Sequence, residues 1–121
     1  MNYKLLLNFA LLTGEIMLEN GAETFRVEDT ISRILHTSNC QTAEAFVTPT
    51  GIFATLDHAD IDLMSYVRRI KKRTININKI ALANSISRSF CSEELTLEAA
   101  MYQLQQVKKE PEYSPWIRIS S

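Results

Sequence analysis

The spacing of apolar residues changes twice along this chain, and that change limits the folds open to it. Apolar residues recur at helical spacing over residues 5–39, alternate with polar residues over 41–73, and return to helical spacing after residue 74. This order predicts an α+β fold with two N-terminal helices, a three-stranded antiparallel meander and two C-terminal helices. A chain of 121 residues, 45% of them hydrophobic, is sufficient for one domain, which we place at residues 1–110.

The first helix is predicted from Leu5, Phe9, Leu12 and Ile16, which recur at helical spacing. Further apolar residues widen this stripe, so we expect the helix to be buried on more than one side. Asn20-Gly21 then ends it, because glycine readily adopts the left-handed conformation that closes a helix. A second helix is predicted to begin near residues 22–24 and to end near 36–39.

The three strands follow from alternation and from the breaks between them. The first contains Ala43, Ala45 and Val47 and stops at residues 49–51, Pro-Thr-Gly. The second covers residues 52–56, residues 57–62 form a turn, and the third strand covers 63–72. Because the links are short, the strands should pair in an antiparallel meander. Such a small sheet needs the helices as a cover.

After residue 74 two further helices are predicted. Asn76 or Asn78 caps the first of them, and Thr96 caps the second. Helical spacing in the first is carried by Ile77, Ile80, Ala81, Asn84 and Arg88, and in the second by the buried stripe Ala100, Leu104 and Val107. Pro111 should end the last helix. Residues 111–121 then form a tail with two aromatic residues, Tyr113 and Trp116.

The candidate site is a polar stripe on the second helix. Residues three and four apart share a helix face, so one continuous stripe contains Glu23, Arg26, Asp29, Thr30 and Arg33. The opposite stripe, which should be buried, contains Val27, Ile31, Ile34 and Leu35. The polar stripe is either a solvated face with weak ion pairs or a contact surface. Glu15 and Glu19, four residues apart on the preceding helix, should point in one direction.

Other kinds of site are weakly supported by the residues. Asp57, His58, Asp60 and Asp62 lie in one predicted turn, but a zinc site needs three or four converging ligands and a calcium loop needs six or more oxygens. We interpret the segment as an acidic hairpin tip and expect no metal and no cofactor. There is no Gly-x-Ser-x-Gly motif, and the two cysteines are distant in sequence, which is typical of free thiols.

Charge does not favour nucleic acid as a partner. The net charge is −1, and five of the six residues over 68–73 are cationic. On a strand these cations point to opposite faces, which fits a solvated edge strand. The N-terminal apolar run is interrupted by Asn8, Thr13 and Glu15, so we expect neither a membrane span nor a secretory signal.

The polar stripe also carries a resemblance. Gly21-Ala22-Glu23-Thr24, Arg26-Val27-Glu28-Asp29-Thr30 and Arg33-Ile34 together resemble the signature of the threonine/serine exporter family. Weaker similarity extends through Val47-Thr48-Pro49-Thr50, Ile75-Asn76-Ile77, Asn84, Arg88, Tyr113 and Trp116.

The resemblance implies a cytoplasmic N-terminal domain of a membrane transporter that moves threonine, serine or related small acids outward. Its membrane part would follow Ser121 or be a separate chain, and residues 111–121 would lead toward it. The domain would then gate or assemble that part at the cytoplasmic face of the plasma membrane. The implied contact surface contains Glu19, Glu23, Thr24, Arg26, Asp29, Thr30 and Arg33. A homo-oligomer is one assembly that the resemblance allows.

Two other interpretations use the same residues. An acid beside a guanidinium could bind the ammonium and carboxylate of an amino acid at a regulatory or waiting site. The cluster of Glu23, Arg26 and Asp29 could instead serve a small hydrolase-type enzyme. Arg26 and Arg33 would, however, keep the neighbouring carboxylates ionised, which favours an ion-pair network over proton transfer. We therefore expect that the chain is not an enzyme.

Overall fold

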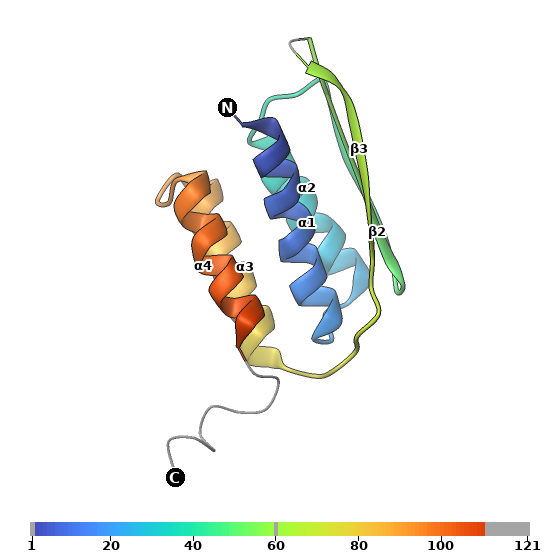
Figure 1. Ribbon diagram of the computed structural model, residues 1–121, viewed down its shortest axis with the longest axis vertical. Coiled ribbons are helices and arrows are strands. Elements are labelled where there is room, and N and C mark those ends of the chain that lie inside the picture. Colours follow the sequence, from blue (N-terminus) through green and yellow to red (C-terminus); the bar gives the residue numbers. More distant parts are fainter. Residues whose placement is uncertain (1, 60, 111–121) are drawn as a thin grey trace.

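The computed structural model describes residues 2–59 and 61–110, and its elements follow the predicted order (Figure 1). The helices and strands are α1 (Tyr3–Glu19), α2 (Thr24–His36), β1 (Thr42–Thr48), β2 (Gly51–His58), β3 (Ile61–Arg69), α3 (Ile77–Cys91) and α4 (Leu97–Lys109). The predicted α+β fold class is therefore confirmed. Pro111 and the tail with Tyr113 and Trp116 lie outside the described residues.

The sheet is a meander in the order β1-β2-β3, with both neighbouring pairs antiparallel. The predicted turn at residues 57–62 is too long, since β2 continues to His58 and β3 begins at Ile61. The third strand also ends three residues earlier than predicted. Arg69 pairs with Gly51, the first residue of β2, so residues after Arg69 have no strand partner. Ile70 is instead buried, and its amide donates to the carbonyl of Thr50 at 2.9 Å.

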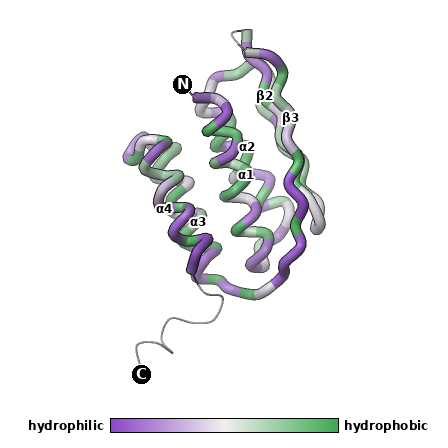
Figure 2. Tube along the Cα trace, viewed as in Figure 1, coloured by the Kyte–Doolittle hydropathy of each residue, from purple (hydrophilic) through white to green (hydrophobic). Residues whose placement is uncertain are grey.

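The helices cover one face of the sheet in two layers (Figure 1). α1 and α2 pack directly on the strands, and α3 and α4 pack against α1 from the far side. Helix α1 therefore lies in the centre of the molecule, which explains the wide apolar surface in its sequence. Its Phe9 is fully buried, and its ring meets Phe90 of α3 edge to face with the ring centroids 5.3 Å apart. In Figure 2 much of α1 is coloured hydrophobic, whereas the segment between β3 and α3 is largely hydrophilic.

The two C-terminal helices are capped as the sequence predicts. The side chain of Asn76 accepts a hydrogen bond from the Lys79 amide, and Thr96 accepts one from the Ala99 amide, both at 3.1 Å. The helical spacing predicted α3 correctly, without indicating which of its faces is buried. Ile77, Ala81 and Arg88 are exposed, whereas the buried residues are Lys79, Ala83, Ile86, Ser87 and Phe90. Contact between Phe90 and α1 decides which of two semi-apolar faces turns inward.

Candidate functional site

Helix α2 is positioned by the glycine bend before it and by one completely buried side. Gly21 has a φ of 108°, a conformation that side chains disfavour, and the amide of Ala22 closes the end of α1 on the carbonyl of Met17 at 3.0 Å. Four apolar residues of α2 have no exposed surface at all: Val27, Ile31, Ile34 and Leu35. Burial of this stripe is as predicted, and it leaves the opposite face of α2 in solvent.

That face holds most of the predicted polar stripe, with two differences. Glu23, Arg26, Asp29 and Arg33 are exposed, and a carboxylate oxygen of Asp29 lies 3.0 Å from Nε of Arg33. Because both side chains are largely exposed, this pair contributes only about 0.3–0.5 kcal/mol. Thr30 is buried, and its hydroxyl donates to the Arg26 carbonyl at 3.0 Å. Thr24 is half-buried at the first turn of the helix.

A groove of about 470 Å³ lies between α2 and α3, on the side where the polar stripe faces the C-terminal helices. Its lining residues are Arg26, Asp29, Thr30, Arg33, Asn84, Ser87, Arg88, Cys91 and Ser92. Three arginines therefore line this groove, and Asp29 is the one acid among its lining residues. Asn84 and Arg88 come from a segment more than fifty residues away in sequence, so only the packing of α3 on α2 brings them here. The groove has an excess of positive charge suited to a carboxylate.

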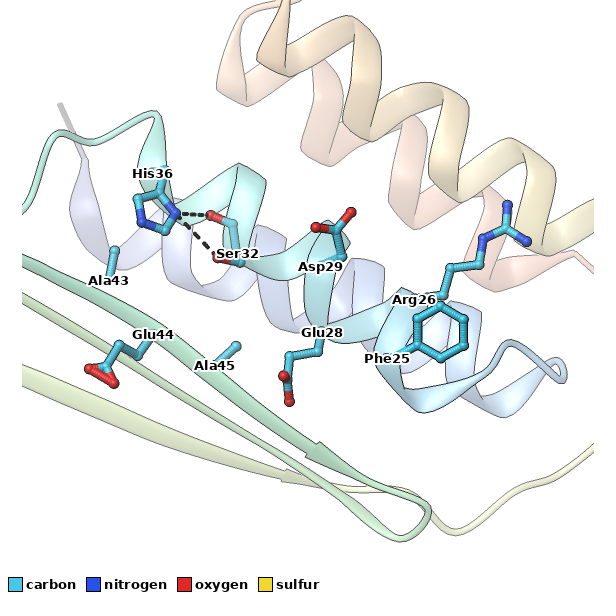
Figure 3. Close-up of a pocket in the computed structure, with 9 residues that line it drawn as sticks. All are labelled: Phe25, Arg26, Glu28, Asp29, Ser32, His36, Ala43, Glu44 and Ala45. Carbon is cyan, nitrogen blue, oxygen red and sulfur yellow. Dashed lines mark hydrogen bonds between the residues drawn. The ribbon is translucent and has the colours of Figure 1, made fainter.

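A second hollow, of about 730 Å³, lies on the other side of α2, against β1 (Figure 3). Two of its polar residues have clear local roles. A carboxylate oxygen of Glu28 accepts a hydrogen bond from the Val47 amide at 3.0 Å. This bond gives a partner to one backbone amide on the edge strand β1. Nδ1 of His36 lies 2.6 Å from the Ser32 carbonyl. Figure 3 shows Glu28 directed toward β1 and Arg26 directed away from it. Phe25 is exposed at this hollow.

Glu19 lies elsewhere, in a cluster of four charges that joins α1 to β3 and α4. The two carboxylate oxygens of Glu15 meet Nη1 of Arg68 and Nζ of Lys108, each at 2.6 Å. Nζ of Lys108 also lies 2.7 Å from Oε1 of Glu19. The spacing of Glu15 and Glu19 correctly predicted that they point together. Their cations could not be predicted, because Arg68 and Lys108 are 53 and 93 residues away from Glu15.

The charge cluster stabilises the fold with its groups ionised. Burial alone would raise the pKa of Glu15, but hydrogen bonds and positive charge from Lys108 and Arg68 outweigh it and hold that pKa below the usual 4.5. Burial acts to lower the pKa of Lys108, and its hydrogen bonds to Glu15 and Glu19 raise it above 10.5. Glu15 is thus a structural carboxylate and does not retain a proton near neutrality.

Acid should remove the stability that Glu15 contributes through this cluster. A carboxyl whose folded pKa is depressed contributes stability above its unfolded pKa, and this contribution is lost as the pH falls through the folded pKa. We expect Glu15→Gln to reduce the free energy of unfolding by about 2 kcal/mol at pH 7, since two charged hydrogen bonds are weakened. The deficit should shrink steadily below pH 4.5, as measured by urea unfolding of both proteins between pH 3 and 7. Glu94→Gln, at an exposed site in the loop between α3 and α4, is the control and should give no such trend. A pH-independent deficit would contradict the assignment.

The remaining candidate groups do not form a reactive centre in the described part of the chain. Both cysteines are free thiols, as predicted. Burial raises the pKa of Cys91, although the Ser87 hydrogen bond and the Arg33 charge act in the other direction, so this thiol in the groove is protonated at neutral pH. The ring of His58 stacks on Tyr3, with the centroids 5.3 Å apart. Within residues 2–59 and 61–110 no group of three His, Cys, Asp or Glu side chains could hold a metal ion.

None of the helices in the described ranges is long and apolar enough to cross a bilayer. Comparison with known protein families gives one match. The model of the ThrE family, described as "Putative threonine/serine exporter", matches residues 8–121. No curated protein and no solved structure matches the chain. The family match covers both sides of the α2–α3 groove and indicates a transport role of the exporter type. The chain therefore belongs to the threonine/serine exporter family.

Proposed function

We propose that this domain is the cytoplasmic part of a threonine/serine exporter-like transporter and that it gates or assembles the membrane part through the α2–α3 groove. The single observation that carries this proposal is that three arginines, Arg26, Arg33 and Arg88, line one exposed groove. The docked group would be an acidic segment of the membrane part, since guanidinium groups bind carboxylates in a bidentate manner.

The arrangement of α2 supports docking at this face. The buried stripe of α2 anchors the helix in the core, so Arg26 and Arg33 extend from a rigid element. The Asp29 carboxylate pairs with Arg33, while neither Arg26 nor Arg88 has an ion-pair partner among the described residues. Two guanidinium groups are therefore available to a partner.

The other two interpretations have less support. Binding of threonine or serine in this groove would use a guanidinium for the carboxylate, but Asp29, the acid available for the ammonium, already pairs with Arg33. A hydrolase would need a second carboxylate or a nucleophile beside Asp29. Glu23 does not line the groove and the Cys91 thiol is protonated, because burial raises its pKa. We do not propose an enzyme.

Charge reversal in the groove tests the docking proposal. In cells that produce the exporter with this domain, Arg26→Glu combined with Arg88→Glu should reduce the efflux rate of labelled threonine at least fivefold. The reason is that two attractive contacts become repulsive. Lys109→Glu, an exposed reversal on α4 away from the groove, is the matched control and should leave efflux unchanged.

Two further measurements separate the alternatives. The double variant should melt within a few degrees of the wild-type chain by circular dichroism, since both arginines are exposed. Unchanged efflux in a stable, fully expressed double variant would refute the docking proposal. Calorimetric titration of the purified domain with threonine should give no heat of binding, and saturable binding lost in the double variant would favour the amino-acid site instead.

A further inference from the structure

The sheet has an open face that no described element covers (Figure 1). All four helices lie on the other side, where α1 and α2 pack on the strands and α3 and α4 form the layer beyond them. On the open face one row of register partners, Phe46, Phe53 and Val67, crosses all three strands, and these side chains are 61%, 44% and 62% exposed. The rings of Phe46 and Phe53 have centroids 6.2 Å apart. An exposed apolar row of this kind is typical of an interaction surface.

Two opposite charges flank the apolar row at equivalent positions. Glu44 lies on β1, two residues before Phe46, and Arg69 lies on β3, two residues after Val67. Both are exposed, and no ion pair joins either of them to another described residue. Each is therefore one strand and two residues away from Phe53, in opposite directions. With ordinary strand dimensions, each charge lies roughly 8 Å from Phe53 in the plane of the sheet.

This pattern is complementary to itself. In a dimer with two-fold symmetry the same surface serves both copies, and every contact occurs twice. Consider a two-fold axis that passes through the Phe53 contact, parallel to the two sheets and perpendicular to the line from Glu44 to Arg69. This axis places the Glu44 position of one copy opposite the Arg69 position of the other. We propose that two copies of this chain associate face to face through this surface, with Phe53 against Phe53 and two Glu44–Arg69 pairs between the copies. A surface for an unrelated partner has no need to place its charges symmetrically, whereas one that binds its own copy does.

The geometry of this association is that of known sheet packing. Rotation about an axis that exchanges the Glu44 and Arg69 positions makes the strands of the two sheets cross at roughly 70°, close to the orthogonal class. Packed sheets lie about 10 Å apart, a gap that glutamate and arginine side chains can bridge from opposite sides. Three short strands supply less area than a standard interface of about 800 Å² per partner. We therefore expect weak association, with a dissociation constant of roughly 10–100 µM.

Charge exchange is the decisive experiment. Sedimentation equilibrium of the purified 121-residue chain should show a monomer–dimer equilibrium between 5 and 500 µM. Glu44→Arg alone gives a surface with two cations, and Arg69→Glu alone gives one with two acids, so each should weaken self-association about tenfold. A mixture of these two single variants should recover wild-type association as a heterodimer. The double variant Glu44→Arg/Arg69→Glu should also recover it, because both pairs are restored in reverse.

A second pair of variants tests the apolar centre. Phe53→Glu should abolish dimerisation, because it places two carboxylates at the symmetry axis. Leu82→Glu on α3 is the matched control, since Leu82 is 45% exposed, and it should dimerise as the wild type does. A wild-type chain that stays monomeric at 500 µM would refute the proposal. Failure of the mixed single variants to associate, while each remains folded by circular dichroism, would refute it as well.

Discussion

Replacing Lys108 by methionine should reduce the free energy of unfolding by about 2–3 kcal/mol, the largest loss expected from any single charge in this domain. The Lys108 ammonium lies between Glu15 and Glu19, at 2.6 and 2.7 Å. Without it, two carboxylates that are only 13% and 12% exposed would face each other four residues apart on α1. Removing one partner of a buried pair usually costs about 3–5 kcal/mol, and we lower this range because Lys108 is 36% exposed.

Methionine tests the charge separately from packing, because it keeps most of the aliphatic length of lysine. For a domain of this size we expect the melting temperature to fall by roughly 8–15 °C. Lys109→Met, at the exposed neighbouring position, should change the melting temperature by no more than about 2 °C.

Glu19→Gln in the Lys108→Met background should recover part of the loss, because one of the two opposed carboxylates becomes neutral. Additive effects of these two substitutions in a double-mutant cycle would contradict the proposed coupling.

Valine in place of Gly14 should destabilise the domain by about 3 kcal/mol through overpacking. Gly14 lies on the buried side of α1, where this helix crosses α2 and β2. A Cβ atom at this position would come within 2.5 Å of Cδ1 of Ile31 and 3.1 Å of Cδ1 of Ile52, both of them in fully buried side chains. Valine adds two further methyl groups to a site that already lacks room for one. Urea unfolding of the two purified proteins measures the difference.

Alanine at the same position separates packing from helix propensity. Gly14→Ala gains up to about 1 kcal/mol of helix propensity but pushes Ile31 aside, so we expect a net loss between zero and about 2 kcal/mol. Ile31→Val removes the Cδ1 atom that the new Cβ would meet. In the wild-type protein Ile31→Val costs about 0.5–1.5 kcal/mol of unfolding free energy. In the Gly14→Ala protein the same substitution should cost less. A Gly14→Val protein as stable as the wild type would show that α1 and α2 are not packed as closely as described.

Local signals account for the parts of the fold that were predicted correctly. The Asn20-Gly21 bend, the caps Asn76 and Thr96, and the buried stripe of α2 all depend on residues within a few positions of one another. Strand ends and the inward face of α3 were less predictable, because they depend on the length of a neighbouring strand and on contact with α1. Arg69 ends β3 because β2 begins at its partner Gly51, a fact that no local pattern contains.

The candidate site divides in the same way. The sequence by itself determined that Arg26, Asp29 and Arg33 share an exposed helix face, since a 3.6-residue period places them together. It also contained the resemblance to an exporter family that the family match confirms. Tertiary structure alone decided that Arg88 joins them across the α2–α3 groove, while Glu19 pairs with Lys108. The physical reason is that these contacts join residues tens of positions apart, and their meeting depends on how whole helices pack.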